Sequence, residues 1–297
     1  MFSYFKYQLK MCFRSMGFIT AFSFNLIICL LNTLLIAYQC RDCDVNMLPA
    51  ASECFILRTN TPCNNIFRLV FIFILVLPFG FYVYKNKKNN IQPILVARTT
   101  LKNHYISSAF CSFLCTFICF AIPLLLSAFI NYIVFPNDGT LLSEISEYTY
   151  NHTAAITGDN VFQNTVQKGE PFVWLYIKSP LVYNIFYSVI FSAFCGLLSL
   201  FIHSLSYYIY VLPILTFLPL YLITFIQQKI DNVNLSNDTS ELYVNYNIND
   251  YIMIGTFYGK STTYFIAFIA ISFLLSIILL ILNYNYVVGG KNIKERR

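Results

Sequence analysis

The chain has 297 residues, of which 58% are hydrophobic and only 11% charged, and its net charge is +6 at pH 7. A soluble domain has about 25% charged residues, so this chain has too few to cover a surface exposed to water. The high apolar content also excludes an intrinsically disordered chain. The composition therefore predicts an integral membrane protein.

Six stretches are long and apolar enough to cross a bilayer as helices, which takes about 20 residues each. In chain order they are Gly17–Tyr38, Ile66–Tyr84, Ile106–Val134, Pro180–His203, Tyr207–Gln227 and Ser261–Tyr284. Only residues 204–206 separate the fourth span from the fifth, which predicts a tight helical hairpin. The predicted fold class is all-α integral membrane, with residues 1–297 forming a single transmembrane domain of six transmembrane helices.

The charges orient these spans. With the N-terminus inside, the cytoplasmic segments are 1–16, 85–105, 204–206 and 285–297, and the extracytoplasmic loops are 39–65, 135–179 and 228–260. The cytoplasmic segments hold 12 basic residues and one acid, whereas the loops, with Arg68 at the edge of a span, hold 7 basic and 12 acidic residues. Because Lys and Arg are enriched on the cytoplasmic side, we expect a multi-pass protein of the cell (plasma) membrane with both termini cytoplasmic.

The positions of the acidic residues also limit the class of transporter. None of the 13 acids falls inside a predicted span, and of the histidines only His203 lies near one, at its cytoplasmic boundary. Proton relays and ion-coupled transporters use intramembrane ionisable groups. The sequence therefore disfavours a secondary transporter, and we expect any transport energy to come from another chain.

Two cytoplasmic segments have a helical pattern of their own. Lys6, Lys10 and Arg14 repeat every four residues, which predicts an amphipathic helix over 1–16 with its basic face toward anionic headgroups. The alternative is an irregular basic tail. Residues 91–105 mix apolar and basic side chains after Pro93, which favours a short cytoplasmic helix between the second and third spans. A simple basic loop is the alternative there.

Four cysteines, Cys40, Cys43, Cys54 and Cys63, fall in the first extracytoplasmic loop. An extracytoplasmic location permits disulfides, so we expect two bridges across residues 39–65, with three possible pairings. A zinc site is the weaker alternative, because only the first two cysteines have the C-x₂-C spacing.

Three more cysteines, Cys111, Cys115 and Cys119, repeat every four residues along the third span. Small, polarizable side chains in one stripe are typical of a face that packs against another helix.

Signatures of catalysis are missing from the sequence. Residues 255–261 (GTFYGKS) resemble a phosphate-binding loop but have three intervening residues where the motif needs four. The three histidines lie in different segments, and no polar residues are predicted to converge at mid-membrane, as an intramembrane enzyme would need. We expect no enzyme activity in this chain itself, no metal, no cofactor and no nucleic-acid partner.

An N-terminal amphipathic helix, six spans with both ends inside, and a cytoplasmic helix after the second span together resemble the ABC-2 type permease subunits of ABC transporters. The closest local likeness is residues 92–108 (QPILVARTTLKNHYISS). The resemblance implies that residues 1–16 are the elbow helix and that 85–105 contain the coupling helix, which docks on a separate ATP-binding cassette subunit. The implied contact residues are Gln92, Ile94, Leu95, Arg98, Thr99, Lys102 and His104.

The same resemblance implies a second permease, identical or homologous, and ATP with Mg²⁺ bound only on the partner ATPase. The expected activity is ATP-driven export or clearance of a hydrophobic or amphipathic substrate such as a peptide, drug or lipid. The alternative is a non-transporting membrane receptor, sensor or assembly subunit that binds an extracellular ligand through residues 39–65 and 135–179.

Overall fold

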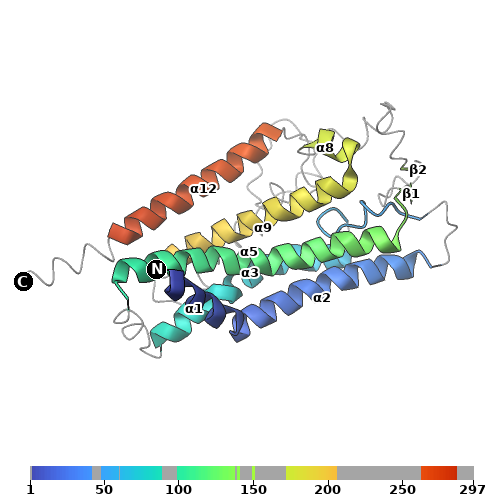
Figure 1. Ribbon diagram of the computed structural model, residues 1–297. Helices are drawn as coiled ribbons and strands as arrows, with labels where there is room; N and C mark the ends of the chain where they lie inside the picture. The colour runs from blue at the N-terminus through green and yellow to red at the C-terminus, as the bar shows by residue number, and fades with distance from the viewer. Residues whose placement is uncertain are drawn as a thin grey trace, which may run out of the picture.

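A computed structural model of the chain describes residues 2–41, 48–59, 61–88, 99–137, 139–140, 149–150, 172–205 and 262–285. This part of the chain is almost entirely α-helical (Figure 1). Its helices are α1 (Phe2–Phe13), α2 (Met16–Gln39), α3 (Pro62–Lys88), α5 (Leu101–Val134), α8 (Val173–Lys178), α9 (Pro180–Leu205) and α12 (Thr262–Tyr284). Two short strands, β1 (Gly139–Thr140) and β2 (Thr149–Tyr150), pair antiparallel with Gly139 opposite Tyr150.

Five described helices contain a stretch long and apolar enough to cross a membrane. These stretches are Met16–Gln39, Pro62–Gly80, Leu101–Val134, Pro180–Ser204 and Phe265–Leu282. They match five of the six predicted spans, and the remaining prediction, residues 207–227, lies outside the described residues. The described chain is thus that of an all-α protein with the helices of a multi-pass membrane protein.

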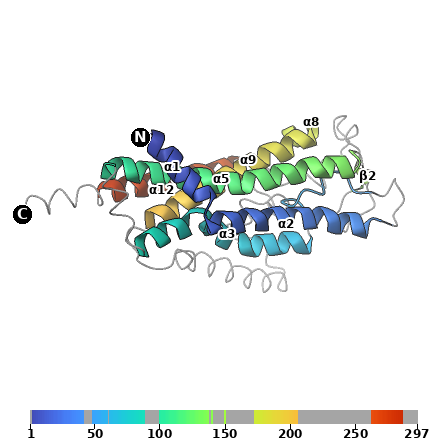
Figure 2. The ribbon, with the colours of Figure 1, turned by 60° about the horizontal axis from the view of Figure 1, so that its bottom comes forward.

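The five long helices run side by side and have two distinct ends (Figure 1). We call the end where α2 and α5 begin and α3 and α9 finish the α1 end, because α1 lies there. We call the opposite end the α8 end. Helix α1 does not run along the bundle but crosses it near the start of α5 (Figure 2), with contacts to α2, α3 and α5.

Side-chain caps set the start of two long helices. The Ser15 hydroxyl accepts a hydrogen bond from the Phe18 N–H at 3.2 Å, which separates α1 from α2. The Thr100 hydroxyl likewise accepts from Asn103 N–H at 3.3 Å and begins α5. The sequence-based start of the third span, at residue 106, falls inside this helix. Helix α5 runs through it unbroken, because Tyr105 is already buried against the bundle.

Helices α5 and α9 form the central contact of the bundle. An ideal Cβ built on Gly196 of α9 would lie 2.8 Å from the ring of Phe113 and 3.1 Å from its carbonyl oxygen, so the two helices approach closely at this glycine. The phenylalanine rings of α3, α5 and α9 pack beside it, with centroids of Phe67 and Phe191 5.9 Å apart. Close approach at a small residue is a common way for helices to associate in a bilayer.

Gly196→Ala is expected to lower the free energy of unfolding by about 1–3 kcal/mol, although alanine is the better helix former. The added methyl group must displace Phe113, whose backbone is part of α5. Thermal unfolding in detergent measures the effect, with Gly17→Ala in the first turn of α2 as the matched control. Equal stability of the two variants would contradict the close contact.

The cysteine stripe of α5 is a packing face, as its spacing predicts. Cys111 and Cys115 are fully buried against Cys12 of α1, and the Cys12 thiol donates to the carbonyl of Pro78 at 3.0 Å. Cys119 is also fully buried, and its carbonyl accepts from the side-chain amide of Asn25 at 3.1 Å. The stripe thereby joins α5 to both α1 and α2.

Candidate functional site

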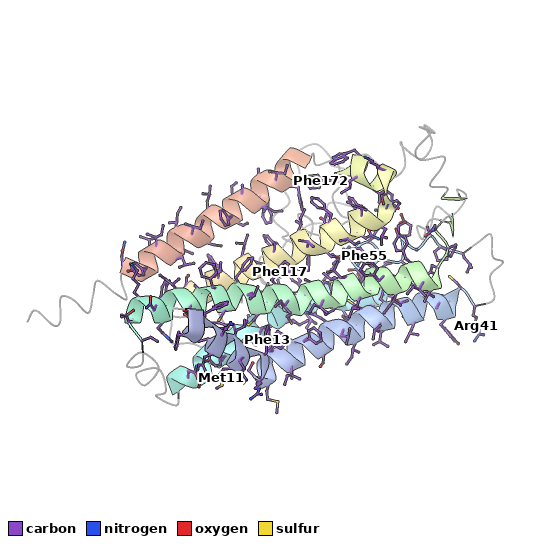
Figure 3. All side chains as sticks on the ribbon, viewed as in Figure 1. Met11, Phe13, Arg41, Phe55, Phe117 and Phe172 are labelled. Carbon is purple, nitrogen blue, oxygen red and sulfur yellow. The ribbon has the colours of Figure 1, made fainter. Side chains whose placement is uncertain are left out.

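The most unusual part of the fold is residues 48–59, the described part of the connection between α2 and α3. Their sequence predicts an extracytoplasmic loop, and in the structure they pack among the helices at the α8 end. Ala50, Ala51, Cys54, Phe55 (labelled in Figure 3), Ile56 and Leu57 are fully buried. We call residues 48–59 the inserted segment.

Asparagine side chains from three helices hold the backbone of the inserted segment. The amides of Asn32 on α2 and Asn131 on α5 donate to the carbonyl of Cys54, at 3.0 and 2.9 Å. The amide of Asn184 on α9 donates to the carbonyl of Ser52 at 3.2 Å. All three asparagines are buried. A buried carboxamide without a hydrogen-bond partner destabilises a protein. The positions of these three asparagines therefore favour a peptide backbone between the helices.

The side-chain oxygens of Asn131 and Asn32 are used as well, whereas that of Asn184 is buried without a hydrogen-bond partner among the described residues. The Asn131 side-chain oxygen accepts from the Thr33 hydroxyl at 2.6 Å. The Asn32 oxygen accepts from Thr59 at 3.3 Å and from Thr61 at 2.5 Å, which ties the far end of the inserted segment and the start of α3 to α2. The backbone of Ala51 donates to the carbonyl of Pro136 at 2.8 Å. Hydrogen bonds therefore fix the inserted segment along its length.

A buried ion pair lies within the inserted segment. The Arg58 guanidinium bonds the Glu53 carboxylate at 2.9 Å, and their side chains are only 5% and 10% exposed. The Tyr176 hydroxyl of α8 donates to the other Glu53 oxygen at 2.6 Å, and the Arg58 guanidinium lies 4.2 Å from the centre of the Tyr176 ring. The predicted spans contain no acid, and Glu53 is indeed outside the helices, yet it is buried in the bundle.

Cys54 is the inserted segment's cysteine. Burial, with a smaller contribution from the Glu53 carboxylate, raises the pKa of the Cys54 thiol, so it stays protonated and unreactive at neutral pH. Cys40 lies in the same apolar cluster as Cys54, but none of Cys40, Cys54 and Cys63 forms a disulfide with another described residue. If the four cysteines formed two bridges, one bridge would contain Cys43 and the other would have to join two of these three cysteines. The prediction of two disulfides is therefore wrong for this structure, and Cys43 lies outside the described residues.

At the α1 end, polar side chains join α1 to the start of α5. The Tyr4 hydroxyl and Nδ1 of His104 form a hydrogen bond of 2.6 Å, and the Gln8 amide donates to Tyr4 at 3.1 Å. His104 and Gln8 are buried, whereas Lys6 and Lys10 on the opposite side of α1 are exposed. The amphipathic helix predicted for residues 1–16 is thus present as α1, with its basic side chains facing away from the bundle.

The Tyr4 hydroxyl gives this contact a pH dependence. Burial, with a smaller effect of Tyr82, raises the pKa of Tyr4 to about 12, while in the unfolded chain it ionises near about 10. The stabilisation of the folded state by the neutral Tyr4 hydroxyl is complete below about pH 10 and is lost as the pH rises through about 12. We expect the stability difference between the wild type and Tyr4→Phe to shrink over this range in circular-dichroism melts. A difference that is constant from pH 9 to pH 12 would contradict the burial of Tyr4.

Deeper at the same end, α5 and α9 share hydrogen bonds beside a small cavity. Ser108 of α5 bonds Nε2 of His203 at 3.1 Å, and the Ser112 and Ser199 hydroxyls are 2.6 Å apart. The cavity is lined by Val76, Phe79, Gly80, Ser112, Ser199, Ile202 and His203. Its volume of about 10 Å³ is close to the smallest that accommodates one water molecule, so it is not a site for a larger ligand.

The structure divides the residues implied as ATPase contacts. Gln92, Ile94, Leu95 and Arg98 lie outside the described residues. Thr99 immediately precedes the Thr100 cap, and Lys102 is exposed in the first turn of α5. His104 on α5 is instead buried against α1, where it bonds Tyr4, so its side chain does not face a partner subunit. Within the described ranges no group of three or more His, Cys, Asp or Glu side chains is arranged to hold a metal ion.

The described helices, with five potential spans and a peptide segment inserted between them, define the class as a polytopic helical membrane protein. Comparison of the chain with protein-family models, with curated proteins and with solved structures finds no match. The likeness to ABC-2 type permeases therefore depends on the layout of the sequence.

Proposed function

We propose that the chain is the permease subunit of an ATP-driven ABC transporter, with six spans, both termini cytoplasmic, and a location in the cell membrane. The observation that carries the proposal is the position of α1. A short helix with exposed Lys6 and Lys10 crosses the bundle and is hydrogen-bonded through Tyr4 to the start of α5. An elbow helix of a permease would be attached in this way, next to the segment that meets the ATPase.

The charges at the two ends support the proposed orientation. Four exposed cations, Lys6, Lys10, Arg14 and Lys102, belong to the α1 end, compared with Arg41 and Lys178 at the α8 end, and no described acid lies on α1 or in the first turn of α5. The buried Glu53 belongs to the opposite end. Under the positive-inside rule the α1 end is cytoplasmic, and an ATPase could reach it from that side.

In this function the chain performs no chemistry on ATP. ATP and Mg²⁺ bind the partner cassette subunit, whose closure pushes on residues 92–102. A second permease, identical or homologous, completes the pathway in the lipid bilayer. The substrate is hydrophobic or amphipathic, and its exit side is the α8 end. The receptor alternative is less well supported, because burial of residues 48–59 leaves less of the first loop to display to a ligand.

Orientation and partner can be tested with one matched pair of variants. Lys102→Cys at the α1 end and Lys178→Cys at the α8 end are both exposed positions. A membrane-impermeant maleimide added to intact cells should label residue 178 and spare residue 102, as quantified by peptide mass spectrometry. A photo-crosslinking amino acid at position 102 should capture an ATP-binding cassette chain, and one at position 178 should not. Labelling of residue 102 from outside would contradict the proposed orientation, and equal capture at both positions would contradict the proposed contact.

A further inference from the structure

The inserted segment occupies a place that is built for a peptide backbone. The side-chain N–H groups of Asn32, Asn131 and Asn184 donate to its carbonyl groups, at positions 52 and 54, and the Asn32 oxygen also accepts from the Thr59 hydroxyl. Backbone carbonyl groups are present in every peptide. A lipid tail has no such acceptors, so the donors on α2, α5 and α9 favour a peptide over a lipid tail.

The side chains of the segment fit the rest of the site through apolar contact. Phe55, Ile56 and Leu57 are fully buried in the main core, together with Tyr176 and Tyr183. Backbone hydrogen bonds combined with apolar side-chain pockets are a common mode of peptide recognition in proteins. The site is therefore suited to a short apolar peptide.

The ion pair is internal to the segment and would favour its release into water. Glu53 and Arg58 both belong to the segment, so they leave together and regain hydration when the segment moves into water. A buried ion pair contributes less net stability than apolar residues of the same volume, although breaking it is costly. Tyr176 on α8 contacts both charges and so ties the segment to the helices.

We propose that the α8 end contains a binding site for an apolar peptide and that residues 48–59 are its resident, self-inhibiting occupant. As a statement about substrate this rests on the proposed permease function, and it narrows the substrate class to apolar peptides. The occupant closes the exit side, and an arriving peptide takes its place on the same asparagines. As binding must displace the occupant, the apparent affinity of a free peptide is reduced by the small fraction of open sites.

The test uses the purified full chain in lipid nanodiscs, without any ATPase. The probe is an isotope-labelled synthetic peptide with the sequence of residues 48–59 (LPAASECFILRT), and a scrambled peptide is the control. Adding the probe should increase hydrogen exchange at the chain's own residues 50–57, and the scrambled peptide should not. Unchanged protection of residues 50–57 at saturating probe, or equal displacement by the scrambled peptide, would overturn the proposal.

An independent measurement places the same substitution in the chain, in the probe peptide or in both, and compares the affinities of the probe. Arg58→Ala in the chain weakens only the occupant, so the wild-type probe should bind that variant at least tenfold more tightly than the wild-type chain. A probe peptide with the same Arg-to-Ala change should bind the variant chain at least tenfold more weakly than the wild-type probe does. Equal affinities in all combinations would overturn the proposal. If the peptide displaces the segment but no ATPase is recovered from membranes, the peptide site stands and the permease function is rejected. If an ATPase is recovered but the peptide displaces nothing, the permease function stands and the peptide site is rejected.

Discussion

Arg58→Ala should lower the free energy that holds residues 48–59 between the helices by about 3–5 kcal/mol, because it leaves the Glu53 carboxylate buried without its charge partner. At about 1.4 kcal/mol per tenfold, the hydrogen-exchange protection of residues 54–57 should fall by roughly two to three and a half orders of magnitude. Exchange measured by mass spectrometry in nanodiscs reports this change residue by residue.

The double variant Glu53→Met/Arg58→Met is the matched control. It removes both charges and keeps apolar volume, so its protection should return to within about 1 kcal/mol of the wild type or exceed it. Lys178→Ala, an exposed change on the same short helix as Tyr176, should have no effect on residues 54–57. If the single and double variants lose equal protection, the ion pair is not what secures the inserted segment.

Arg98→Glu combined with Lys102→Glu should reduce the amount of ATP-binding cassette chain that purifies with the protein by at least tenfold. Two charge reversals at one interface turn attraction into repulsion and cost several kcal/mol. Lys102 is exposed next to the capping Thr100, so the change at this position leaves the packing of α5 intact. Quantitative mass spectrometry of the purified complex measures the ratio of the two chains.

Lys178→Glu is the control for that experiment, since it reverses an exposed charge at the α8 end. It should leave the recovery of the ATPase unchanged. The protein yield and the melting temperature of all variants should match the wild type. A tenfold loss with Lys178→Glu as well would mean that the charge at residues 98 and 102 does not determine the contact.

The spans were predictable because a bilayer imposes a length and a composition on each helix. All five helices that are long and apolar enough to span coincide with apolar runs visible in the sequence, and the stripe of Cys111, Cys115 and Cys119 correctly indicates a packing face. The start of α5 at Leu101 was not predicted because basic residues such as Lys102 look cytoplasmic, although the helix that carries them begins at the Thr100 cap and continues unbroken to Val134.

The inserted segment could not be predicted from its own residues. Twelve residues with a buried Glu53 and no helical or alternating pattern look like a loop. A signal existed elsewhere, in Asn32, Asn131 and Asn184, because carboxamides in apolar spans need partners. A search limited to ionisable residues overlooks them. The disulfide prediction failed for a related reason, since cysteine spacing along a chain does not fix the distance between the thiols.

The most direct test of the central claim is affinity purification of the tagged full chain from its own membranes in a mild detergent, followed by mass spectrometry. The permease assignment predicts recovery of a chain with the Walker A and Walker B motifs of an ATP-binding cassette, in an amount comparable to the bait. Repeated purification of intact, folded protein without any such chain would contradict it.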